Sequence, residues 1–166
     1  MAKWLTKQQQ EYWRSFLSVM HLLPDVFSHD LKEHGLSLSD YEILVRLSEA
    51  DSKAIRMSEL ARQTLATRSR LTHQVDRLED QGLVTRYTCS QDKRGLWAQL
   101  TDEGYGLLVT LAPIHVQSVR KNLVDVLSER ELELLGTISD KILNSLPEEF
   151  QAKSLSISKD AHKRDE

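Results

Sequence analysis

The sequence predicts a mainly α-helical fold with one small β-hairpin, an α+β class. Apolar side chains recur at steps of three and four residues before about residue 50 and again after Thr101, as in amphipathic helices. Between them, two runs alternate apolar and polar residues, Leu83 to Thr88 and Leu96 to Thr101, as strands with one buried face do. The 166 residues have room for one domain with a good core.

The first two predicted helices precede the alternating runs. One covers about residues 8–34, and Pro24 should kink it or split it in two. The next ends near Ala50, and its start carries a capping box, Ser39 with Glu42, and a hydrophobic staple, Leu38 with Ile43. The apolar stripe of the first helix is Trp13, Phe16, Leu17, Met20, Leu23, Phe27 and Leu31.

A short extended piece at residues 55–57 leads into two further helices. Ser58 is the expected cap of the first of them. Thr67 starts the second, which buries Leu71, Val75 and Leu78 and stops at Gly82. The hairpin that follows has a charged loop, residues 89–95.

The helical pattern returns after Thr101 and runs to Val126. A second capping box, Ser128 with Glu131, and a staple, Leu127 with Leu132, open a last helix that Pro147 ends. We expect one domain over residues 1–146 and a charged, flexible tail over 147–166. The stripe of the long helix is Leu107, Leu108, Leu111, Ile114, Val119, Leu123 and Val126.

Composition excludes several classes of protein. Cys89 is the only cysteine, so one chain can form neither a disulfide framework nor a multi-thiolate zinc site. No segment approaches the roughly 20 apolar residues of a membrane span, and residues 1–10 lack the apolar stretch of a signal peptide. We expect a cytoplasmic protein with no membrane partner and no cofactor.

Charge is unevenly distributed along the chain. From Lys53 to Trp97, nine Lys or Arg stand against five acids, whereas the rest of the chain has 13 basic and 20 acidic residues. A local charge of +4 therefore lies inside a chain whose net charge is −3. Because position matters more than the total, the middle segment is the candidate for binding nucleic acid.

The helix from Thr67 carries the donors that such binding needs. A helix fits the major groove of DNA, where arginine bonds guanine and hydroxyls reach bases or phosphates. The alternative is an ordinary amphipathic helix with a solvated face, since Asp76, Glu79 and Asp80 also lie on it. The candidate contacts are Thr67, Arg68, Ser69, Arg70, Thr72, His73 and Arg77.

The hairpin tip adds a second cationic element. Lys93 and Arg94 stand at the end of a narrow ribbon, where a cation can enter a minor groove. Asp92 could hold Arg94 through an ion pair, and Gly95 frees the backbone for a turn. The alternative is a charged hairpin that only keeps the protein in solution. With the helices, this hairpin makes a winged helix-turn-helix unit of about residues 37–101.

These motifs together resemble the multiple-antibiotic-resistance regulator (MarR) family over roughly residues 8–146. The resemblance implies a homodimer built by helices at about 8–34 and 102–146, which represses a pseudo-palindromic operator in double-stranded DNA until a small ligand, a metal or an oxidant weakens binding. The long apolar stripes also exceed what a unit of some 60 residues needs. The matching stretches are Arg56–Ala61, Ser69–Glu79, Gly82–Arg86, Asp92–Gly95 and Leu100–Gly104.

Two residues depart from the family pattern. His73 stands where the family often has arginine, which could make DNA contact weaker or sensitive to pH. Oxidant-sensing relatives use a cysteine in the N-terminal helix, whereas Cys89 lies at the hairpin, so we do not transfer that mechanism and interpret Cys89 as structural.

Effector candidates lie on the flanking helices, because family ligands sit between these helices and the winged unit. They are aromatic or polar groups on apolar helices, although aromatics at such spacing are usually core. A metal site is not predicted, since His29, Glu33 and His34 do not form a tight set. The pocket candidates are Trp13, Phe16, His21, Tyr41 and His115.

Two other function classes compete with a DNA-binding repressor. The same surface could hold another protein instead of DNA, although its basic face argues against that. An enzyme is not expected, because the chain has no Gly-rich phosphate loop and no nucleophile–base motif. Some methyltransferases carry a winged domain, but their catalytic domain has no place in this chain.

Overall fold

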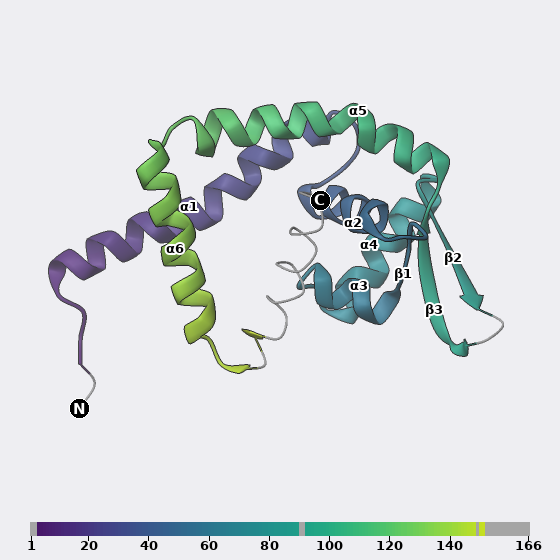
Figure 1. Cartoon of the computed structure of the whole chain (residues 1–166), viewed down its shortest axis with the longest axis horizontal. Coiled ribbons are helices and arrows are strands. Elements are labelled where there is room, and N and C mark those ends of the chain that lie inside the picture. Colours follow the sequence, from purple (N-terminus) through teal and green to yellow (C-terminus); the bar gives the residue numbers. More distant parts are fainter. Residues whose placement is uncertain (1–2, 90–91, 149, 152–166) are drawn as a thin grey trace.

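The computed structural model describes residues 3–151 except residues 90, 91 and 149; the side chains of Cys89 and of residues 92–94 are also outside the description. It confirms the predicted α+β class (Figure 1). The elements are α1 (Lys7–Lys32), α2 (Leu38–Glu49), β1 (Ala54–Arg56), α3 (Met57–Gln63), α4 (Arg68–Asp80), β2 (Val84–Cys89), β3 (Asp92–Leu100), α5 (Asp102–Val119), the π-helical segment η1 (Arg120–Val124) and α6 (Glu129–Ser145).

The winged unit packs α2, α3 and α4 beside a small antiparallel sheet. The predicted hairpin is present, but β1 pairs with β3 as well, so the sheet has three strands in the order β1-β3-β2. Figure 1 shows β2 and β3 projecting from one end of the molecule, while α5 leads away from the sheet alongside α1. The core lies inside this unit and reaches α1 through Leu31 and α5 through Leu111.

The cap of α2 differs from the prediction. Ser37, not Ser39, is the N-cap, and its side chain accepts a hydrogen bond from the Asp40 backbone. Asp40 completes the box by accepting from the Ser37 backbone at 3.0 Å, so Glu42 has no part in it. The staple positions move with the cap, from Leu38 and Ile43 to residues 36 and 41.

Helix α3 also begins differently. It starts at Met57 with Arg56 as its N-cap, and no side chain caps it. Ser58, the predicted cap, therefore lies inside the first turn. The extended chain before it pairs with β3 up to Arg56, and the helix follows directly from that pairing.

Pro24 does not split the first helix. Helix α1 continues through it to Lys32, and its C-terminal half packs along α5. A proline removes one backbone donor, and a helix of 26 residues retains the other bonds. At its start Thr6 and Gln9 form a capping box that the sequence interpretation missed.

The last helices bury less than their patterns suggested. Helix α5 ends at Val119 in the π-helical turn, and Val126 is 67% exposed. The predicted capping box of Ser128 with Glu131 is confirmed, yet α6 buries none of its residues. No helix in the described part of the chain is long and apolar enough to cross a membrane.

The expected flexible tail begins with an ordered turn. The backbone N–H groups of Phe150 and Gln151 donate to the Pro147 carbonyl, and the Gln151 side chain donates to Asn144 at the end of α6. Residues 152–166, where most of that expectation falls, lie outside the described residues.

Candidate nucleic-acid interface

Helix α4 is oriented by its cap and its buried stripe. The Thr67 side chain accepts a hydrogen bond from the Arg70 backbone at 3.2 Å, which confirms the predicted start. Leu71, Val75 and Leu78 are buried as predicted. The opposite face of α4 must therefore meet the solvent.

Exposed donors crowd the first half of that face. The side chains of Thr67, Arg68, Ser69, Arg70, Thr72 and His73 are all exposed. No carboxylate stands among them, because the acids of α4 begin at Asp76. The first one or two turns of α4 thus present cations and hydroxyls to solvent. A recognition helix inserts this N-terminal part into a groove of DNA.

Arg77, the last predicted contact on α4, has a structural partner. Its guanidinium donates to Asp40 Oδ1 at 2.8 Å, and Asp40 is only 4% exposed. A buried carboxylate without a cation would be costly, so Arg77 ties α4 to the capping box of α2. Its side chain remains 56% exposed, and a DNA contact by it stays a prediction.

Asp76 and Glu79, which the sequence interpretation treated as ordinary surface acids, hold β2 against α4. Arg86 pairs with Asp76 at 2.7 Å and donates to Glu79 through its backbone and its side chain, each at 2.9 Å. These bonds lower the pKa of Glu79, with the Arg86 side-chain hydrogen bond as the largest cause. The network fixes the wing relative to α4. The sequence signal for this network is that Arg86 follows Glu79 by seven residues.

The wing is built as a two-stranded ribbon. Asp92, Lys93 and Arg94 begin β3, while their side chains lie outside the described part of the structure. Gly95 lies within β3 rather than in a turn, which corrects the prediction, because the strand starts at Asp92, four residues before the predicted start at Leu96. Tyr87 and Trp97 stack across the two strands with ring centroids 6.4 Å apart.

The predicted effector residues fall into separate groups. Tyr41 and His115 lie together, with ring centroids 4.7 Å apart, and Phe27 approaches His115 at 6.0 Å. Trp13 and Phe16 neighbour each other, and both are exposed on α1. His21 is exposed as well. The structure thus brings Tyr41 and His115 together but does not place Trp13, Phe16 or His21 with them, and an effector pocket stays a prediction.

The ring of His115 sits where α1, α2 and α5 meet. Burial lowers its pKa, and its Nδ1 is buried without a hydrogen-bond partner among the described residues. The largest concavity nearby, about 870 Å³, lies between α1 and α5 and includes His29 and Glu33. No group of three or more His, Cys, Asp or Glu side chains in the described residues could hold a metal.

Comparison with known proteins decides the family. The model of the MarR family matches residues 36–96, which include α2 to β2 and the first part of β3. The chain is 31% identical over 137 residues to the regulator PecS of Dickeya dadantii, covering 80% of each protein. The chain belongs to the MarR family. Curated MarR-type relatives such as PecS are transcriptional regulators rather than enzymes.

Solved MarR structures share the fold beyond the winged unit. AbsC of Streptomyces coelicolor is 42% identical, with a TM-score of 0.82 over 86% of this chain and 97% of AbsC. Sco3205 of the same organism, solved in complex with DNA, is 41% identical, with a TM-score of 0.85 over 90% of this chain and 94% of Sco3205. The flanking helices α1, α5 and α6 therefore belong to the MarR fold, as the resemblance implied.

Proposed function

We propose that this chain is a homodimeric, sequence-specific repressor that binds a pseudo-palindromic DNA operator and is released by a small ligand or an oxidant. The observation that carries the DNA-binding part is the exposed first half of α4, where arginines and hydroxyls stand without a carboxylate. Sco3205, whose solved structure includes DNA, gives this proposal further support. Such a protein acts in the cytoplasm, on chromosomal DNA.

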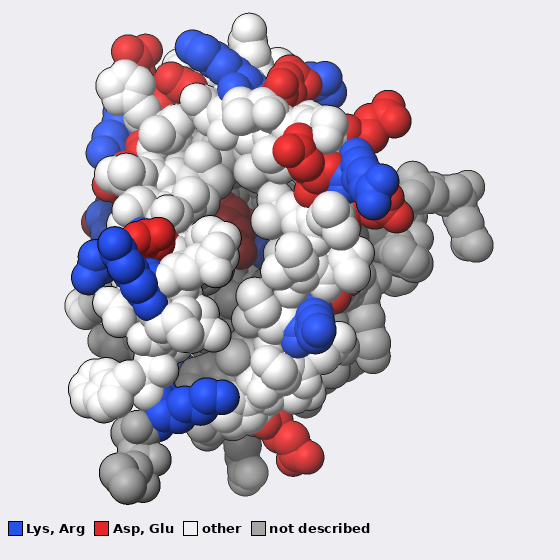
Figure 2. Space-filling model, turned by 90° about the vertical axis from the view of Figure 1, so that its left-hand side faces the viewer, with Lys and Arg blue, Asp and Glu red and all other residues white. Residues whose placement is uncertain are grey.

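A second copy of the chain is the proposed cover for α1 and α6. Figure 2 shows the end of the molecule where these helices lie, and uncharged side chains fill much of the middle of that face. An exposed apolar face this large is unusual for a monomer. The exposed apolar residues are Tyr12, Trp13, Phe16, Val19, Met20, Leu22 and Val26 of α1 and Leu134, Leu135, Ile138, Ile142 and Leu143 of α6.

Sedimentation tests the dimer directly. Ile138 and Ile142 lie one turn apart on α6, so Ile138→Glu with Ile142→Glu places two charges on the proposed interface. We expect the unchanged chain to sediment as a dimer and the double variant as a monomer. Asp140→Asn is the matched control, because Asp140 is an exposed polar residue on the same helix. A monomeric unchanged chain would overturn this part of the proposal.

Salt dependence separates DNA binding from a protein-binding role. Each phosphate contact releases counterions, so affinity for a DNA site should fall steeply as potassium chloride rises. The measurement is a fluorescence titration of labelled genomic fragments at several salt concentrations. A chain that binds no fragment more tightly than bulk DNA would contradict the proposal and favour the protein-interaction alternative.

A further inference from the structure

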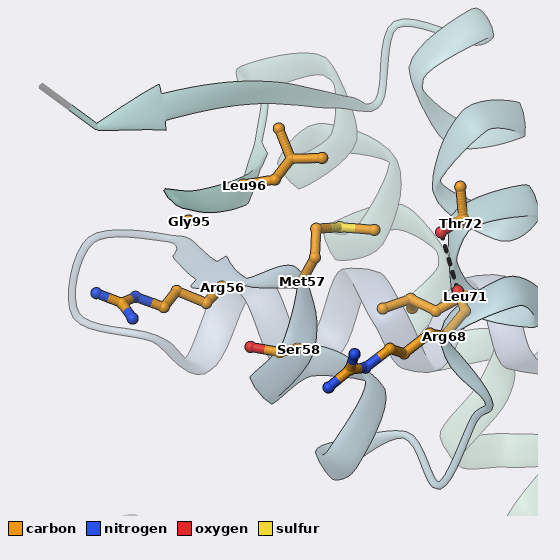
Figure 3. Close-up of a pocket in the computed structure, with 8 residues that line it drawn as sticks. All are labelled: Arg56, Met57, Ser58, Arg68, Leu71, Thr72, Gly95 and Leu96. Carbon is orange, nitrogen blue, oxygen red and sulfur yellow. Dashed lines mark hydrogen bonds between the residues drawn. The ribbon is translucent and has the colours of Figure 1, made fainter. Parts of the chain in front are cut away.

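A concavity of about 360 Å³ lies between the recognition helix and the root of the wing. Figure 3 shows its walls, with β3 at Gly95 and Leu96 on one side, α4 at Leu71 and Thr72 on another, and the start of α3 between them. From the sequence, DNA contacts are expected only at α4 and the wing tip. The β1–α3 junction contributes Arg56, Met57 and Ser58 to this concavity.

The lining has an apolar floor and a cationic rim. Buried Leu71, half-buried Met57 and the more exposed Leu96 form the floor. Arg56 and Arg68 lie at the rim, and both side chains are exposed, as is that of Ser58. The Arg56 guanidinium stands 5.4 Å from the centre of the Trp97 ring, which anchors it beside the sheet.

No carboxylate lines this concavity among the described residues. Two other concavities differ in this respect: the one between α1 and α5 includes Asp25 and Glu33, and the one beside α2 and β1 includes Glu49. The concavity next to α4 is thus suited to an anion attached to an apolar group.

The geometry of duplex DNA supplies an occupant of that chemistry. A strand of the sugar-phosphate backbone separates each major groove from the neighbouring minor groove. If α4 enters the major groove and the wing enters the adjacent minor groove, that strand must pass between them. The concavity occupies this place, between α4 and β3.

We propose that this concavity seats one deoxyribose-phosphate unit of the operator, with the sugar on Met57, Leu71 and Leu96 and the phosphate between Arg56, Ser58 and Arg68. The inference rests on the proposed function, because it needs a bound duplex. It makes Arg56 and Ser58 DNA contacts that position the protein on the backbone and carry no sequence information.

The test compares Arg56→Gln, Ser58→Glu and the control Arg62→Gln on a selected operator and a panel of its single-base variants. Arg62 is an exposed arginine of α3 that pairs with Glu59 and does not line the concavity. We expect Arg56→Gln to weaken binding about tenfold on every sequence and to reduce the slope of log affinity against log salt by about one. Arg62→Gln should leave affinity unchanged.

Ser58→Glu separates a DNA contact from a structural role. A carboxylate in the first turn of a helix favours the helix, so the melting temperature should stay equal or rise. A carboxylate at Ser58 also repels a phosphate, so binding should weaken at least as much as in Arg56→Gln. Normal affinity and salt slope in both variants would overturn the inference, as would a loss confined to one base pair. An unchanged chain that selects no DNA would overturn the proposed function itself.

Discussion

Single side chains decide which groups α4 presents to solvent. Thr67 fixes the first turn of α4 by accepting from the Arg70 backbone, and this orients the exposed donors that follow. Arg77 belongs to the same helix but holds the buried carboxylate of Asp40. The sequence could predict the exposed face of α4, because exposure follows from helical period, whereas the Arg77–Asp40 pair joins residues 37 positions apart.

Arg70 is the residue most suited to base reading. It lies in the first turn of α4, is exposed, and its side chain has no hydrogen-bond or ion-pair partner among the described residues. We expect Arg70→Ala to change the preferred DNA sequence, since one bidentate arginine–guanine pair is worth roughly 1–3 kcal/mol of discrimination. Selection from a random pool with both proteins checks this. Identical preferred sites would show that Arg70 does not read a base.

His115 predicts a specific pH dependence of stability. Burial lowers its pKa in the folded chain below the ordinary 6.5, so the unfolded chain binds more protons as pH falls through and below 6.5. The neutral ring therefore contributes stability that is present above pH 6.5 and is lost as pH falls. We expect the melting temperature to drop less between about pH 7.5 and about pH 5.5 in His115→Phe than in the unchanged chain.

The replacement is matched to the site. Phenylalanine keeps an aromatic ring against Tyr41 and Phe27 and removes the buried Nδ1 that has no partner in the described part of the chain. Stability at neutral pH should consequently be equal or higher. Parallel pH profiles for the two proteins would show that His115 does not titrate in this range.

At the scale of elements, local signals predicted the N-caps of α4 and α6 but not those of α1, α2 and α3. The caps at Thr67 and Ser128 are as predicted, because each depends on residues within three positions. The cap of α2 was ambiguous, since Ser37 and Ser39 both precede an acid by three residues. The ion pair of Asp40 with Arg77 favours the first, and no short pattern reveals it.

The junction of the wing with α5 depends on one glycine. A Cβ on Gly104 would stand 2.1 Å from the Leu83 carbonyl oxygen, whereas a Cβ on Gly106 would meet nothing within 4 Å. We expect Gly104→Ala to lower the free energy of unfolding by about 1–3 kcal/mol. Gly106→Ala, two residues on in the same helix, should raise it by about 0.5–1 kcal/mol.

Urea unfolding at one protein concentration measures both variants, since the stability of the proposed dimer depends on concentration. Equal stability of Gly104→Ala and the unchanged chain would mean that the backbone at Leu83 moves freely away from α5. That result would contradict a rigid junction between wing and helix.

For the whole molecule, the sequence predicted the division into a basic winged unit and apolar flanking helices. The sequence pattern already shows more apolar residues on these helices than the winged unit needs. In the structure, α6 buries none of its apolar residues. The effector pocket could not be predicted in the same way. Its candidate residues were chosen by type, but Trp13 and Phe16 lie on the exposed part of α1 and Tyr41 packs at the α2–α5 contact with His115.

Two winged units joined through α1 and α6 would present two copies of α4 to one face of a duplex. Selection of bound DNA from a random pool tests this account most directly. We predict one enriched motif with two inverted half-sites whose centres lie about 34–36 Å apart. A pool without enrichment, or a single half-site with no inverted partner, would contradict it.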